Sequence, residues 1–179
     1  MNDGLIPSRY AKALYKLAVE TGECDTIYEQ MRTVSGRYSA IDELKRVLLN
    51  PYIPAEDKGK VMLQIAGAEP GSSLDKFILL VIKNNRAEFL RKIALSYVNL
   101  YREKHNIAKV VIETAAELPQ EKIDAIIEVV KKQLPGMTLE TSTEVNPDLI
   151  GGFTVTIGDV LLDASVKNEL NKLRFKLLS

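Results

Sequence analysis

The sequence predicts an α+β protein, with an N-terminal six-helix bundle followed by a small α/β C-terminal domain. Up to His105, apolar residues recur every three or four positions, which is the period of amphipathic helices. Beyond it, short β-branched runs such as Val110–Thr114 and Phe153–Ile157 indicate strands. Residues 1–105 carry sixteen Lys and Arg against thirteen Asp and Glu, whereas residues 106–179 carry eight against eleven. We therefore predict two domains, over residues 1–105 and 106–179.

Each of the six predicted helices has a start or stop signal. Proline disfavours helix in the residue before it, so the third helix is expected to end at Asn50-Pro51. Ser72 and Asp75 have the spacing of a capping box, which predicts the start of the fifth helix. The other boundaries are predicted at Pro7-Ser8, Gly22, Pro54, Gly67, Asn84-Asn85 and Ala87. The short connections between these helices are typical of a compact bundle.

The C-terminal domain is predicted to have the order β-α-β-β-β-α, or the same order with one hairpin arm lost to a loop. Val110–Thr114 is followed by a helix that begins at Pro119 and then by an alternating strand over Met137–Val145. Phe153–Ile157 and the apolar run that follows it form a hairpin. Ser165 is a candidate N-cap for a terminal helix. The apolar stripe of that helix is Val166, Leu170, Leu173 and Leu177.

The chain lacks the residue sets that catalysis or metal binding needs. His105 is the only histidine and Cys24 the only cysteine, so no histidine-based triad and no histidine- or cysteine-based metal cluster can be built. Gly151-Gly152 precedes a strand rather than a helix and belongs to no phosphate-binding motif. No strand interleaves basic with aromatic residues, as an RNA-binding sheet would. We therefore predict no catalytic residue, no cofactor, no metal and no nucleic-acid partner.

Two of the predicted helices carry more apolar surface than one core needs. The first helix has one stripe at Tyr10, Ala13, Leu14 and Leu17, and a second at Ala11, Tyr15 and Ala18. The fifth helix is apolar on nearly all sides between Phe77 and Ile82. A helix that is apolar on several sides is buried on several sides. These two are therefore either central helices of the bundle or the walls of a groove that receives an amphipathic helix from a partner.

Four segments of the chain resemble the delta subunit of bacterial F-type ATP synthase, which is similar to the oligomycin-sensitivity subunit of mitochondria. The segments are Arg9–Glu20, Leu48–Lys58, Phe77–Leu90 and Asn146–Leu173. Each alone is a weak signal, but together they stand in the family's order with fitting spacing and span nearly the whole chain. The resemblance implies a six-helix N-terminal domain and a smaller α/β C-terminal domain.

The resemblance also implies a function and a location. It implies a non-catalytic stator subunit whose residues 1–105 hold the N-terminal helix of an alpha subunit between the first and fifth helices. Residues 106–179 are then expected to contact the b subunits of the peripheral stalk. The chain begins close to its first helix, without a secretory or transit signal. We therefore expect a peripheral protein on the cytoplasmic face of the bacterial inner membrane.

The predicted groove residues come from the two helices that are apolar on several sides. We expect them in or beside the groove, and the sequence does not divide them between bundle core and groove wall: they are Tyr10, Ala11, Leu14, Tyr15, Ala18, Phe77, Ile78, Val81 and Ile82. The small residues Ala11 and Ala18 would let a partner helix approach closely, and Tyr15 would form an amphipathic rim. A charged residue at Ala11 or Ala18 is expected to abolish alpha binding while the fold survives.

Two other functions compete with the stator role. A stand-alone helical adaptor would use the same groove for an amphipathic helix of another partner. A small enzyme or RNA-binding protein would use the α/β domain instead. The absence of a plausible nucleophile or ligand cluster argues against the enzyme, and the net negative charge of residues 106–179 argues against RNA binding.

Overall fold

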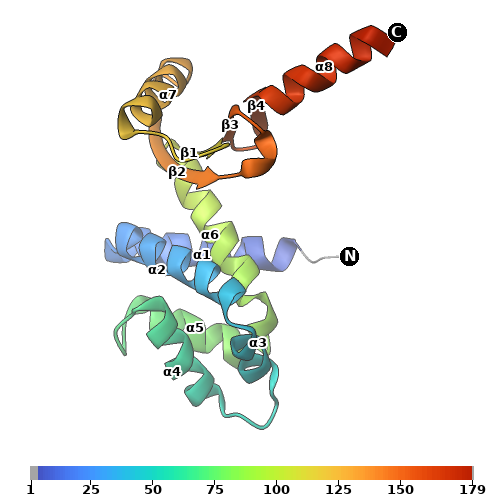
Figure 1. Ribbon diagram of the computed structural model, residues 1–179. Helices are drawn as coiled ribbons and strands as arrows, with labels where there is room; N and C mark the ends of the chain where they lie inside the picture. The colour runs from blue at the N-terminus through green and yellow to red at the C-terminus, as the bar shows by residue number, and fades with distance from the viewer. Residues whose placement is uncertain (1–3, 179) are drawn as a thin grey trace. The chain divides into compact units, whose positions relative to one another are not determined.

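The computed structural model describes residues 4–178, except for the side chains of residues 39, 40, 42 and 176–178. The chain divides into two compact units, Met1–Lys104 and His105–Ser179. The first unit is helical, and the second contains a four-stranded sheet (Figure 1). The predicted combination of helices and a sheet is confirmed.

The helical unit is built from helices whose ends match the predicted signals closely. Its elements are α1 (Leu5–Thr21), α2 (Cys24–Ala40), α3 (Asp42–Leu49), α4 (Ala55–Ala66), α5 (Ser73–Lys83), the 3₁₀ helix η1 (Ala87–Phe89) and α6 (Leu90–Lys104). Gly22 and Gly67 end α1 and α4 in the left-handed conformation that glycine adopts without strain. The α1 helix begins at Leu5, two residues before the predicted start. Pro7 fits there because the N–H groups of the first helical turn need no partner in the helix.

The core of the helical unit lies around α6, which packs against both α1 and α2. Tyr97 of α6 is fully buried and its ring lies 6.2 Å from that of Tyr15. One turn further on, Tyr101 stacks on Tyr28 at 4.2 Å and donates its hydroxyl hydrogen to Asp25. Aromatic residues from three helices therefore share one side of the core.

The α5 helix is held by its N-terminal cap and by close packing on α4. The Ser72 hydroxyl accepts a hydrogen bond from the Asp75 N–H at 3.3 Å, as predicted. The Asp75 carboxylate accepts one from the N–H of Gly71 at 2.8 Å, instead of from Ser72 as in the usual capping box. On α4, a Cβ at Gly59 would lie only 2.7 Å from Cδ2 of Leu79, so glycine lets the two helices approach closely.

The second unit follows the predicted order of elements. They are β1 (Ile107–Thr114), α7 (Gln120–Gln133), β2 (Thr138–Val145), the 3₁₀ helix η2 (Pro147–Leu149), β3 (Gly152–Ile157), β4 (Val160–Ser165) and α8 (Val166–Leu178). The strands lie in the order β2-β1-β3-β4. The β1 and β2 strands are parallel, because α7 connects them, and the β1–β3 and β3–β4 pairs are antiparallel.

The core of this unit lies between α7 and the sheet. Val110, Ile112 and Val155 from the sheet and Val130 from α7 are buried together. The β3 strand begins at Gly152, where φ is +76° and an added Cβ would lie 2.3 Å from the carbonyl oxygen of Ala164. Only glycine fits this close pairing with β4.

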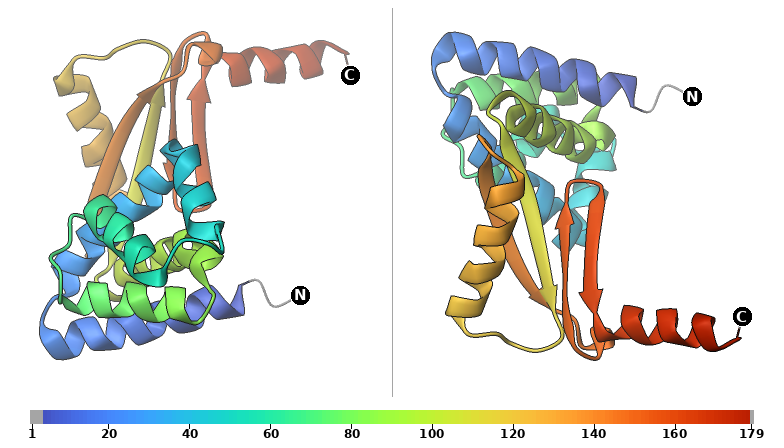
Figure 2. Two further views of the ribbon diagram at one scale, coloured as in Figure 1. Left: turned by 90° about the horizontal axis from the view of Figure 1, so that it is seen from below. Right: turned by 90° about the horizontal axis from the view of Figure 1, so that it is seen from above.

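The α8 helix extends away from the sheet in both views of Figure 2. Its predicted cap is confirmed, because the Ser165 hydroxyl accepts a hydrogen bond from the Asn168 N–H at 3.2 Å. Val166, Leu170 and Leu173 of its apolar stripe are exposed, and the side chain of Leu177 lies outside the described part. Within residues 4–178, no helix has both the length and the apolar character that crossing a membrane requires.

Candidate functional site

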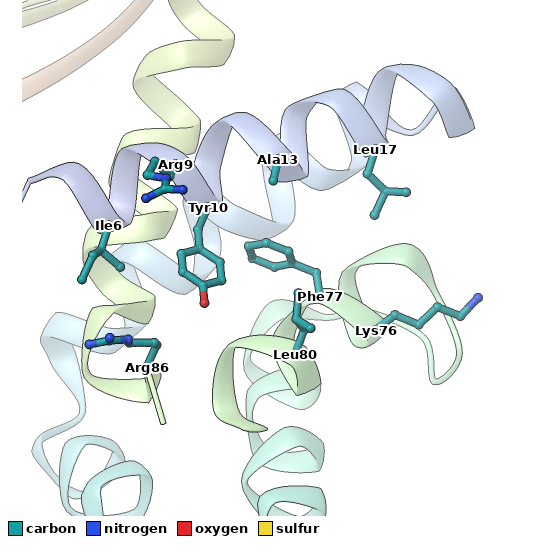
Figure 3. Close-up of a pocket in the computed structure, with 9 residues that line it drawn as sticks. All are labelled: Ile6, Arg9, Tyr10, Ala13, Leu17, Lys76, Phe77, Leu80 and Arg86. Carbon is teal, nitrogen blue, oxygen red and sulfur yellow. The ribbon is translucent and has the colours of Figure 1, made fainter. Parts of the chain in front are cut away.

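A groove of about 640 Å³ runs between α1 and α5 in the helical unit (Figure 3). Its lining residues are Ile6, Arg9, Tyr10, Ala13, Leu17, Lys76, Phe77, Leu80 and Arg86. On α1, the apolar lining positions are separated by four, three and four residues, which places them on one face of the helix. Two helices therefore form opposite walls of a single apolar groove.

The middle of the groove is fixed by two aromatic rings. Tyr10 and Phe77 meet edge to face, with centroids 6.2 Å apart and planes at 72°. Asn84, at the end of α5, donates a hydrogen bond from Nδ2 to the Tyr10 hydroxyl oxygen at 3.2 Å. The Tyr10 ring thus contacts Phe77, and its hydroxyl is hydrogen-bonded to Asn84. This part of the wall is therefore already formed in the chain without a partner.

The apolar side chains of the groove reach solvent. Leu80 is 52% exposed, Ala13 is exposed, and Ile6 and Leu17 are half-buried. Apolar groups gathered in an exposed groove are typical of a surface that binds another protein.

The charged residues of the groove are all cations. Arg9, Lys76 and Arg86 are exposed, and none of the described lining residues is acidic. Figure 3 shows Arg86 beside Ile6 at one end of the groove and Lys76 beside Leu17 at the other. The groove therefore combines an apolar floor with positive ends.

A second apolar groove, of about 470 Å³, lies in the other unit between α7 and strands β3 and β4. Its lining residues are Ala125, Ile126, Val129, Val130, Gln133, Phe153, Val155, Leu162, Asp163 and Ala164. Leu161 of β4, outside this groove, is 58% exposed. The β4 strand lies at the edge of the sheet and thus presents apolar side chains to solvent.

A sequence profile of the ATP synthase delta (OSCP) subunit family matches residues 6–177. The chain belongs to this family. A protein named ATP synthase subunit delta from Phocaeicola vulgatus is 38% identical over 96% of this chain and 92% of its own length. One of the same name from Parabacteroides distasonis is 34% identical over 99% of this chain and 98% of its own length.

The fold itself also occurs in a solved ATP synthase. A chain in the cryo-EM structure of the Toxoplasma gondii mitochondrial ATP synthase hexamer matches with a TM-score of 0.73 and 19% identity. The match covers 97% of both chains. At this identity, the likeness establishes the fold and nothing further.

Membership in the delta (OSCP) family confirms the predicted resemblance. The structure divides the nine predicted residues between the groove wall and the core of the helical unit, a division that the sequence left open. Of the nine predicted groove residues, Tyr10 and Phe77 line the groove. The other seven do not line it: they are Ala11, Leu14, Tyr15, Ala18, Ile78, Val81 and Ile82. Six of these are at most 5% exposed, and Tyr15 is half-buried against Tyr97. The physical reason is that they belong to the core of the helical unit.

The two faces of α1 have different surroundings in the structure. The face with Ala11, Leu14 and Ala18 is the core face, and the face with Tyr10 and Leu17 lines the groove. A charge at Ala11 or Ala18 would therefore be buried, so we expect such a variant to lose stability rather than to keep its fold.

Seven lining residues were missed: Ile6, Arg9, Ala13, Leu17, Lys76, Leu80 and Arg86. Helical spacing places Ile6 on the Tyr10 stripe and so could have included it in the groove. The choice between the two stripes could not be made from periodicity, because both are apolar.

Among the residues that the structure describes, no group of three or more His, Cys, Asp or Glu side chains could hold a metal ion. Burial, and to a lesser degree the charge of Asp25, raise the pKa of the Cys24 thiol. This favours the protonated thiol over the reactive thiolate.

Proposed function

We propose that this protein is a non-catalytic peripheral-stalk (stator) subunit of an F-type ATP synthase. It links the catalytic head to the b subunits, so that rotation is coupled to ATP synthesis. The observation that carries the proposal is the exposed apolar groove between α1 and α5 in a chain of the delta (OSCP) family. In this role the protein lies on the cytoplasmic face of a bacterial inner membrane, attached through the complex.

The helical unit, residues 1–105, serves as a six-helix bundle that holds the N-terminal helix of an alpha subunit. From Ile6 to Leu17 the lining face of α1 extends about 16 Å, or three helical turns. A partner helix of similar length can place one apolar stripe between α1 and α5. Burial of apolar surface contributes roughly 25 cal/mol per Å² before the costs of association. Such contact resists the torque that each synthesis step places on the head.

The second unit, residues 106–179, contacts the C-terminal ends of the b subunits. Two features support this: the groove between α7 and β4, and the exposed stripe of Val166, Leu170 and Leu173 on α8. Both present apolar surface that a helical partner would cover. The two units thus have separate partners.

The test is assembly with purified components from the same organism. The full chain is mixed with the catalytic head, either intact or lacking the N-terminal helix of alpha, and each mixture is analysed by sedimentation velocity. We expect co-sedimentation with the intact head only, and separate binding of the soluble part of b to the full chain. Equal binding to both heads would contradict the groove assignment, and binding to neither would favour an adaptor with another partner.

A further inference from the structure

We propose that the helix bound between α1 and α5 is acidic, with Asp or Glu side chains that pair with Arg9 and Arg86 at the Ile6 end of the groove. One further acidic residue pairs with Lys76 at the Leu17 end. This inference rests on the proposed function and adds the chemistry and direction of the partner helix.

The cations of the groove are available for a partner. None of the ion pairs among the described residues involves Arg9, Lys76 or Arg86. The guanidinium carbon of Arg86 lies 5.9 Å from the ring centroid of Phe89, a contact that positions the group without using its N–H donors. Arg9 and Arg86 can therefore each offer two parallel N–H groups to a carboxylate.

Glu23 is an acidic residue that interacts with Lys76 only weakly. Hydrogen bonds from Ser73 and Thr21 are the main cause of the lowered pKa of Glu23, and Lys76 adds only a weaker effect. Glu23 does not line the groove, and no ion pair joins it to Lys76 among the described residues. The groove thus keeps three positive charges and no acidic lining residue.

The uneven placement of these charges gives the groove a direction. Two arginines lie at the Ile6 end and one lysine at the Leu17 end (Figure 3). Exposed ion pairs add little to affinity, but they steer a partner and penalise the wrong orientation. The apolar floor therefore supplies the binding energy, and the charges select an acidic helix and set which end lies beside Ile6.

The experiment uses three synthetic amphipathic peptides of about 18 residues with the same apolar stripe. Each peptide carries the same three substitutable positions on its polar edge, two near one end and one near the other, and these positions hold Glu in one peptide, Gln in the second and Lys in the third. Binding to the full chain is measured by fluorescence anisotropy. We expect the Glu peptide to bind about tenfold more tightly than the Lys peptide, with an advantage that shrinks as salt is raised. Equal affinities, or no binding by any of the three, would overturn the inference.

Matched variants assign the effect to the groove. Arg9→Glu combined with Arg86→Glu is expected to reverse the preference in favour of the Lys peptide. Lys12→Glu combined with Lys16→Glu changes the net charge equally on exposed positions of α1 outside the groove, and should leave the preference intact. An equal loss in both double variants would show a nonspecific charge effect and contradict the proposal.

Two further measurements separate this inference from the proposed function. A nitroxide at the doubly acidic end of the Glu peptide should broaden the NMR signals around Ile6, and broadening around Leu17 instead would contradict the direction. The native N-terminal helix of alpha is titrated in parallel. If it binds equally well to the Arg9→Glu, Arg86→Glu variant, the stator role stands and the inference falls. If only the designed Glu peptide binds, the inference about an acidic partner stands and the stator role falls.

Discussion

At the scale of single residues, Ala11 and Ala13 have opposite surroundings although they lie two positions apart on α1. Ala11 is 1% exposed in the core, and Ala13 lines the groove. We predict that Ala13→Glu abolishes binding of the alpha helix while the thermal unfolding curve is unchanged. Ala11→Glu should lower the free energy of unfolding by about 3 kcal/mol or more, because it buries a charge. The assignment of the two faces fails if Ala11→Glu unfolds like the wild type.

Gly152 offers a second test at this scale. In Gly152→Ala, the new methyl group would collide with the backbone of β4, so we predict a marked loss of stability in the second unit. Gly158→Ala is the matched control, since its φ is also positive but nothing lies within 4 Å of the added Cβ. We expect about 1 kcal/mol of destabilisation for Gly158→Ala and about 2 kcal/mol more for Gly152→Ala in urea unfolding. Equal losses of unfolding free energy in the two variants would show that the positive φ alone, and not the contact with β4, destabilises Gly152→Ala.

At the scale of elements, the cap of α5 holds one wall of the groove in place. We predict that Ser72→Ala lowers the free energy of unfolding of the helical unit by about 1 kcal/mol, because the Asp75 N–H loses its acceptor. Thr33→Ala removes a hydroxyl that bonds to the Glu29 carbonyl oxygen within α2, where no cap is lost. That control should be neutral or slightly stabilising. A Ser72→Ala protein as stable as the Thr33→Ala protein would refute the role of the cap.

Element boundaries were predictable because the signals that set them are local. Gly22, Gly67 and Ser72 determine helix ends through backbone conformation and hydrogen bonds of their own neighbourhood. The groove was not predictable to the same degree. Alanine occurs on both apolar faces of α1, so the sequence of α1 does not show which face is buried. The α6 helix, about 80 positions further along the chain, packs against α1, and this packing places Ala11 in the core and leaves Ala13 in the groove.

At the scale of the whole molecule, the tyrosines around α6 predict a loss of stability at alkaline pH. Burial is the main cause that raises the pKa of Tyr97 and Tyr101, and the hydrogen bond to Asp25 adds to it for Tyr101. A raised pKa in the folded state contributes stability that is complete below the unfolded value of about 10 and is lost as pH rises above it. We expect the free energy of unfolding to fall above pH 10, by up to about 1.4 kcal/mol per pH unit from Tyr97.

Tyr97→Phe serves as the control for this prediction. The variant keeps the ring but has no group to ionise, so its stability should decline less steeply between pH 10 and 12. Parallel curves for the wild type and the variant, measured by urea unfolding, would exclude Tyr97 as a source of the alkaline loss.

The central claim is that the face of α1 with Tyr10, Ala13 and Leu17 binds a helix of the alpha subunit together with α5. The most direct measurement is an NMR titration of the full chain with a peptide of the alpha N-terminal helix from the same organism. The account predicts saturable shifts at the groove residues Ile6, Ala13 and Leu80, with little change elsewhere in residues 1–104. Shifts confined to other surfaces, or no binding by a folded sample, would contradict it.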